Sequence, residues 1–286
     1  MDNNFLIDLT VRGLFVCGAW WLLRRRLVRR GASAAARHAC GVAAVWALLL
    51  LPLLTLALPS SSAPAALPVL PVTLPVTLPM PPAPPTTPAP PTPPLFAAPV
   101  AVPPITGAAT VGPTAGATLG ALYLLAAGVL LARLALCVGG AVRLLRTGRP
   151  VLPGERLDML FQDAAREIGT RSEGIVGAAR LRVTDAVATP MTAGRTVLLP
   201  ADAAHWADDR LDAVLRHELA HVRRSDWRHL VCAEVACALF FVNPLAWRLA
   251  RTLRADAEKA ADDRVLTSGV APTEYASHLL ALAAAG

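Results

Sequence analysis

The stretch RHELAHVRRSDWRHL, residues 216–230, decides how the rest of the sequence is interpreted. It places His217 and His221 four residues apart, with Glu218 directly after the first histidine. A helix turns by about 100° per residue, so both imidazoles project from one face and can hold one zinc ion. Glu218 is then close enough to take a proton from a water molecule that zinc has made more acidic. The alternative is a charged surface helix, for which no such set of three residues is needed.

Zinc needs a third protein ligand, and the residues that follow exclude one class of zinc peptidase. A metzincin would continue with glycine three residues after His221 and histidine six residues after it, but this chain has Arg224 and Trp227 there. His229 comes two residues later and lies on a different helix face, so we interpret it as an interfacial residue.

A second acidic helix downstream offers the missing ligand. In RADAEKAADDRVL, residues 254–266, Glu258 and Asp262 lie four residues apart and share a helix face. A glutamate ligand followed by a carboxylate that orients a ligand histidine is a sound arrangement around zinc. The alternative is a solvated acidic face, which fits Asp256 and Asp263 best.

The composition indicates a membrane protein. The chain has 286 residues, of which 55% are apolar and 16% charged, and its net charge is +7. Its mean hydropathy is +0.50, which is too apolar for an ordinary soluble domain. No basic stripe on a soluble fold is visible, so we expect no direct binding of nucleic acid. The five cysteines all lie in apolar stretches without a Cys-x-x-Cys pair, and we interpret them as small buried apolar residues.

Three apolar runs are long enough to cross a lipid bilayer. Residues 1–58 hold two of them, 5–23 and 39–58, and 118–138 is the third. The arginine-rich loop RRRLVRR, 24–30, separates the first two, and basic loops favour the cytoplasmic side. The sequence thus predicts a multi-pass protein of a bacterial inner membrane whose N-terminus is external.

Residues 59–117 are predicted to form an external, disordered linker. Eighteen of the 26 prolines fall within 59–104, where LPVTLPVTLP repeats locally. Such a composition cannot form a core. A ligand for polyproline-binding domains is the alternative, but a spacer agrees better with an external location.

From residue 141 onward the sequence predicts a cytoplasmic globular domain, 141–286, on the same side as the arginine loop. Its expected elements are an amphipathic helix, two strands and the metal-binding helix, over 154–169, 181–187, 195–200 and 211–224. We expect a peptide substrate to lie as an extended strand beside RTVLLP, 195–200, and Arg195 could stabilise an oxyanion.

The apolar run 229–247 resembles a fourth span, but a full crossing would separate Glu258 from His217 by roughly 30 Å of hydrocarbon. We therefore predict that this helix is buried in protein or dips into the membrane and turns back at Asn243-Pro244. Glu234, in its middle, should be paired or lie near the site.

Four ordered motifs then resemble those of the BlaR/MecR-type antirepressor family of integral-membrane zinc metallopeptidases. They are HELAH (217–221), NPLAW (243–247), DAEKAADDRVL (256–266) and the segment from Pro190 to LLP (198–200). The resemblance implies a gluzincin site in which His217, His221 and Glu258 bind one zinc ion, Glu218 is the base and Asp262 orients a ligand histidine. It also implies a protein or peptide substrate, such as a winged-helix transcriptional repressor or the chain itself.

With this resemblance, the expected fold is an α-helical multi-pass membrane protein with an inserted α+β zincin-like cytoplasmic metalloprotease domain. The family's penicillin-binding sensor needs a Ser-x-x-Lys motif. The only lysine is Lys259, and Asp256 stands three residues before it, so we expect no such sensor in these 286 residues.

Two other functions are compatible with the same residues. One is a non-enzymatic membrane receptor or scaffold with a structural zinc ion, which would need a fourth protein ligand. The other is a quality-control membrane protease of the Ste24/HtpX type, which uses the same HExxH chemistry on other substrates.

Overall fold

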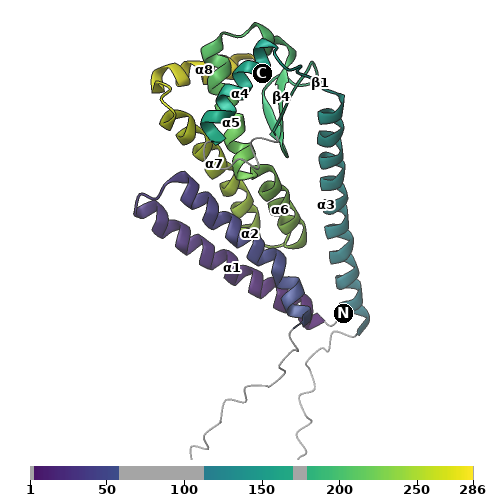
Figure 1. Ribbon diagram of the computed structural model, residues 1–286. Helices are drawn as coiled ribbons and strands as arrows, with labels where there is room; N and C mark the ends of the chain where they lie inside the picture. Colours follow the sequence, from purple (N-terminus) through teal and green to yellow (C-terminus); the bar gives the residue numbers. More distant parts are fainter. Residues whose placement is uncertain (1–2, 58–112, 170–178, 286) are drawn as a thin grey trace, which may run out of the picture. The chain divides into compact units, whose positions relative to one another are not determined.

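The computed structural model describes residues 3–57, 113–169 and 179–285 (Figure 1). The first part of the predicted proline-rich linker, up to residue 112, lies outside the described residues. Its last part, 113–117, is helical and belongs to α3, so the linker prediction is wrong there. The elements, in chain order, are α1 (Asn3–Arg29), α2 (Ala34–Ala57), α3 (Pro113–Thr147), β1 (Arg149–Pro150), α4 (Arg156–Gly169), β2 (Arg180–Thr184), β3 (Met191–Ala193), β4 (Thr196–Pro200), the short 3-10 helix η1 (Ala201–His205), α5 (Asp208–Arg224), α6 (Asp226–Leu239), α7 (Pro244–Thr267) and α8 (Pro272–Ala285).

Among the described residues, three helices are long and apolar enough to cross a membrane, and they overlap the three predicted spans. Their apolar segments are Phe5–Arg29, Ala34–Thr55 and Gly116–Thr147. Large apolar side chains are exposed on them, as on helices that face lipid. Leu136 on α3, for example, is 78% exposed. The predicted arginine-rich loop, 24–30, is wrong for most of its length, because α1 continues as a helix to Arg29.

The cysteines are all free, as expected. Cys17 and Cys237 are buried, and Cys40 and Cys232 are partly buried. Cys137 is exposed, which contradicts the prediction of a buried side chain. The reason is that α3 buries little of its surface within the described part of the protein.

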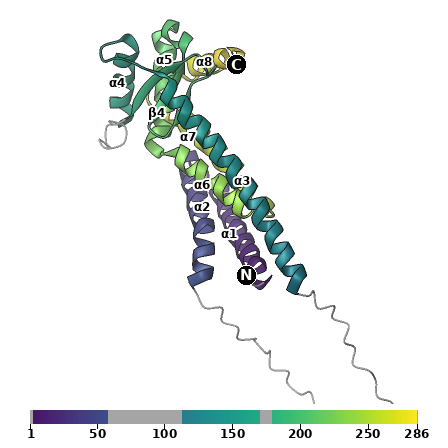
Figure 2. The same cartoon turned by 90° about the vertical axis from the view of Figure 1, so that its right-hand side faces the viewer.

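Helices α1 and α2 lie side by side and pack on α6 and α7 (Figure 1). The shared core is apolar and includes Cys17, Trp20, Val45, Leu48, Phe240, Leu249 and Leu253. At Gly41 the approach of α2 to α7 is close, because an added Cβ would lie 2.9 Å from Leu253 Cδ1. Helix α3 runs beside α6, where Tyr123 donates a hydrogen bond to the carbonyl oxygen of Leu239 (Figure 2).

The apolar run 229–247 is not one helix. Helix α6 ends at Leu239, and α7 begins at Pro244. The side chain of Asn243 caps the start of α7 by accepting a 3.0 Å hydrogen bond from the Leu245 amide. Helix α7 packs back on α6, where Cys237 Sγ lies 3.5 Å from the carbonyl oxygen of Ala246. The predicted reversal at Asn243-Pro244 is confirmed.

Glu234, in the middle of α6, is paired, which is one of the two outcomes expected for it. Its carboxylate lies 3.3 Å from Arg254 Nη2 on α7. Because both side chains are partly exposed, the pair joins two neighbouring helices and does not bury a charge in the apolar core.

The sheet has the order β1-β2-β4-β3, in which β2 and β4 are parallel and the other pairs antiparallel. The predicted strands correspond to β2 and β4. Two short strands, β1 and β3, were not predicted. Since β2 and β3 flank β4 on its two sides, a substrate strand cannot pair with 195–200, and that prediction is wrong.

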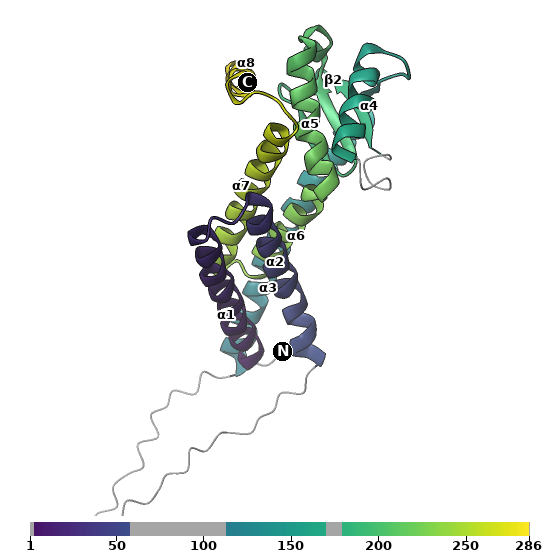
Figure 3. The same cartoon turned by 60° about the vertical axis from the view of Figure 1, so that its left-hand side comes forward.

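Helix α5 lies between α4 and α7 (Figure 3) and is buried on more than one face. Towards the sheet and α4 it contributes Leu211, Leu215, Leu219 and Val222 to one core. The predicted apolar face of α4 completes that core with Leu157, Phe161, Ala164 and Ile168. On another face, Ala213 packs with Val265 and Tyr275 of α7 and α8. The HELAH residues therefore meet the sheet on one side and α7 on the other.

Candidate metal centre

The structure brings together the three residues that the sequence indicated as metal ligands. His217 Nε2 and His221 Nε2 lie 3.2 Å apart on one face of α5. From α7, Glu258 Oε2 lies 3.5 Å from His217 Nε2 and 3.7 Å from His221 Nε2. The helical spacing aligns the two imidazoles, and the packing of α7 on α5 supplies the carboxylate.

This donor set fits a divalent metal ion such as zinc. Atoms bound at about 2.0–2.2 Å to a tetrahedral ion lie roughly 3.3–3.6 Å from one another, close to the distances between these three donors. Two imidazoles and one carboxylate are a usual set for catalytic zinc. Within the described residues the group has three members, which leaves one tetrahedral position for water or substrate.

The second ring nitrogen of His217 is held from α7 and α8. Its Nδ1 lies 2.9 Å from the Tyr275 hydroxyl and 3.2 Å from Asp262 Oδ1. Tyr275 also donates a 2.8 Å hydrogen bond to Asp262. Asp262 is thus placed beside a ligand histidine, as the sequence predicted, while Tyr275 was not foreseen because nothing in its local sequence distinguishes it.

The second ring nitrogen of His221 is held by a residue that the sequence reasoning missed. Asp226 Oδ2 lies 2.7 Å from His221 Nδ1, and Asp226 is buried, with 2% exposure. Ser225, at φ 57° and ψ 36°, ends α5 in a left-handed conformation and begins α6. This sharp break returns Asp226 to the histidine five residues before it, and the only sequence signal was an aspartate just past the HELAH helix.

The charges around the site favour a positive ligand. Burial lowers the pKa of His217, but hydrogen bonds with Asp262 and Glu258 outweigh it and raise the pKa to about 9 in the metal-free protein. For His221, burial is likewise outweighed, by Asp226 and Glu258, and its pKa is raised. Hydrogen bonds from both histidines hold the pKa of Glu258 well below its usual range.

Glu218 faces the sheet side of α5. It is 8% exposed, and its Oε2 accepts a 2.7 Å hydrogen bond from the hydroxyl of Thr192 on β3. The same hydroxyl lies 3.2 Å from the Glu218 carbonyl oxygen. Thr192 was missed because its three-residue strand has no recognisable pattern. Arg195 is exposed in the turn between β3 and β4.

Asp256, two residues before Glu258, connects α7 to α1 and α2, two of the candidate membrane helices. Arg24 Nη2 and Nε lie 3.1 and 3.2 Å from its two oxygens, and Arg37 Nε lies 3.4 Å away. Asp256 is 2% exposed, so a solvated face is wrong for this residue, although it is right for exposed Asp263.

The structure combines apolar helices of membrane-spanning length with a donor set of two histidines and one carboxylate. The class of protein that agrees best with these two features is a membrane metallopeptidase. A family model for the BlaR1 peptidase M56 matches residues 4–286, and the chain belongs to this family. The comparison with curated proteins gives no match. Family membership implies peptidase activity, and three candidate membrane helices associate the protein with a membrane.

Proposed function

We propose that the chain is a zinc-dependent endopeptidase embedded in the inner membrane. The observation that carries the proposal is the convergence of His217 and His221 of α5 with Glu258 of α7, where α5 also carries the buried Glu218 directly after His217. A zinc ion held by the three ligands would polarise the scissile carbonyl and lower the pKa of a water molecule.

Glu218 is the base in this proposal. Its carboxylate takes a proton from the attacking water as the water oxygen forms a bond to the carbonyl carbon. When the carbon–nitrogen bond breaks, Glu218 passes that proton to the departing amine. The hydrogen bond from Thr192 fixes the orientation of one carboxylate oxygen, which leaves the other for this transfer.

We place the substrate along β3. This strand is at the end of the order β1-β2-β4-β3, so its outer backbone groups have no strand partner within the described sheet. It also contacts α5 and carries the threonine that binds Glu218. A peptide added to this edge would hold its backbone next to the base and the metal ligands.

The alternative of a structural zinc ion in a non-enzymatic scaffold agrees less well with the donor set. A closed structural site uses four protein ligands, whereas the group among the described residues has three. In addition, a purely structural ion would not require a buried glutamate held beside it by a threonine.

We place the metal centre on the cytoplasmic side. The arginines in the last turns of α1 and just after it, within 24–30, favour the cytoplasm. Arg24 of this run and Arg37 of α2 contact Asp256, two residues before Glu258. Alkaline phosphatase is active only outside the cytoplasm. Fused after Pro90 it should therefore be active, and fused after Thr147 inactive; the reverse pattern would overturn this orientation.

A signalling role completes the proposal, with a cytoplasmic repressor or the chain itself as substrate. It is supported by membership of the BlaR1 peptidase family. A dedicated peptidase should cut one co-expressed repressor at one bond. Cleavage of many unfolded membrane proteins would instead favour the quality-control function.

The proposed activity is tested by metal removal on the detergent-purified full chain. Chelation should abolish cleavage of a peptide library, and about one equivalent of zinc should restore it. Glu155→Gln, which changes a partly exposed carboxylate just before α4 that pairs with Arg149, serves as a control and should behave like wild type. Cleavage that survives complete metal removal would refute the proposal.

A further inference from the structure

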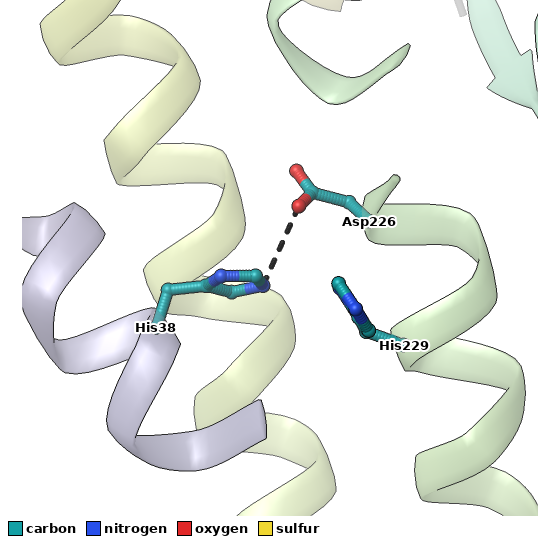
Figure 4. Close-up of side chains that lie close together, drawn as sticks. All are labelled: His38, Asp226 and His229. Carbon is teal, nitrogen blue, oxygen red and sulfur yellow. Dashed lines mark ion pairs between the residues drawn. The ribbon is translucent and has the colours of Figure 1, made fainter. Parts of the chain in front are cut away.

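A second cluster of metal-binding side chains lies at the junction of α2 and α6. His38 of α2 faces Asp226 and His229 of α6 (Figure 4), and one donor atom from each residue lies within 4.8 Å of the others. His38 Nε2 is 3.5 Å from Asp226 Oδ1, and the two imidazole rings are centred 6.0 Å apart. None of these distances requires the helices to move apart to admit an ion.

Two ring nitrogens of this cluster are buried and form no hydrogen bond within the described part of the chain. His38 is 4% exposed, and its Nε2 forms no hydrogen bond within the described part of the chain. His229 Nδ1 is also buried and forms none there. An unpaired buried polar atom costs free energy, so two such ring nitrogens in one cluster point to a ligand at this place.

The carboxylate of Asp226 can serve both clusters, because its two oxygens differ in their contacts. Oδ2 receives the short contacts, 2.7 Å from His221 Nδ1 and 2.6 Å from Arg224 Nη2. Oδ1 has only longer contacts, 3.3 Å from Arg224 Nε and 3.5 Å from His38 Nε2. Oδ1 therefore has lone-pair capacity left on the side that faces the two histidines.

We propose that His38, Asp226 and His229 form a second site for a divalent transition-metal ion. Two imidazoles and a carboxylate oxygen suit zinc and its neighbours and are poor ligands for magnesium or calcium. The ion would join α2, a candidate membrane helix, to α6. It would also hold Asp226, which in turn holds His221, so its binding stabilises the contact between the membrane helices and the peptidase centre.

The test isolates this site in the full chain by first disabling the other one. His217→Ala with Glu258→Gln removes two ligands of the first site without touching Asp226. After dialysis against tens of micromolar zinc, this variant should keep about one ion per chain, and zinc should raise its unfolding temperature. Adding His38→Ala or His229→Ala should remove the bound ion and the thermal shift. His205→Ala, at an exposed histidine, should change neither.

The outcomes separate the two sites. In the otherwise wild-type chain, His38→Ala with His229→Ala should lower the zinc content from about two ions to about one. If the zinc content instead falls from one ion per chain to none, the result supports the second site and removes support for the first. The second site is refuted if the His217→Ala, Glu258→Gln variant binds no zinc, or if zinc binding survives in both histidine variants. Using two histidines separately guards against misfolding of either variant, which circular dichroism would reveal.

Discussion

Thr192 donates a 2.7 Å hydrogen bond to the carboxylate of Glu218 and so connects the edge strand of the sheet to the proposed base. The contact joins two elements that are separated by 26 residues and packed against each other. It gives β3 two tasks, since the strand that would hold the substrate also orients the group that acts on it. A change at Thr192 should thus affect the reaction rate more than the metal content.

Thr192→Val should lower kcat by about 10- to 100-fold, because a hydrogen bond to a charged group contributes about 1.5–3 kcal/mol. Zinc content should stay at the wild-type value, since among the described residues the hydroxyl of Thr192 hydrogen-bonds to Glu218 and to none of the proposed ligands. Thr192→Ser keeps the hydroxyl and should retain most of the activity. Equal rates for the valine and serine variants, measured on a peptide substrate, would mean that the hydrogen bond has no role.

Tyr275→Phe and Asp262→Asn should weaken zinc binding by about 10- to 100-fold, because outer partners of a ligand histidine fix its orientation and basicity. Both residues contact His217 Nδ1, and neither is a member of the second cluster. Chelator competition measures the affinity. Tyr123→Phe is the matched control, since this tyrosine lies on α3 and contacts α6. An unchanged affinity in Asp262→Asn would contradict the assigned contact.

Removal of both Arg24 and Arg37 should destabilise the chain by about 3–5 kcal/mol, because it leaves the buried carboxylate of Asp256 without its charge partners. The unfolding midpoint in detergent measures the loss. Adding Asp256→Ala to that double variant should recover part of it, as the unpaired charge is then gone. Arg29→Ala, at an exposed position, should be neutral; a loss equal to that of the double variant would contradict this explanation.

Zinc affinity should fall as the pH is lowered. In the metal-free protein the pKa of His217 is raised to about 9, so below that pH its imidazole carries a proton that zinc must displace. The raised pKa of His221 acts in the same direction. Titrations between about pH 6 and pH 8 should show affinity increasing with pH and protons released on binding. Affinity independent of pH across that range would contradict protonated histidines in the free site.

Local periodicity explains what could be predicted from the sequence. A spacing of four on one helix already aligns His217 with His221, and the same spacing relates Glu258 to Asp262. The turn at Asn243-Pro244 was predictable because proline ends one helix and suits the start of the next. These features depend on neighbours in the chain, so they needed no knowledge of the tertiary structure.

The missed features depend on the tertiary structure or on unusual backbone. The contact of Arg24 with Asp256 joins residues 232 positions apart, and no local pattern specifies it. Asp226 reaches His221 only because Ser225 adopts a positive φ, which non-glycine residues rarely do. The edge strand β3 is too short for alternation to be recognised, so its pairing with 195–200 was not predicted.

The most direct test of the central claim compares Glu218→Gln with Glu258→Gln in zinc content and cleavage rate, measured on the same preparations. The second cluster is first removed by His38→Ala with His229→Ala, so that only one metal centre is counted. Glu218→Gln should keep about one zinc ion and lose cleavage, whereas Glu258→Gln should lose the zinc as well. If Glu218→Gln cleaves at the rate of its parent, or Glu258→Gln holds zinc as tightly as its parent, the assigned roles are wrong.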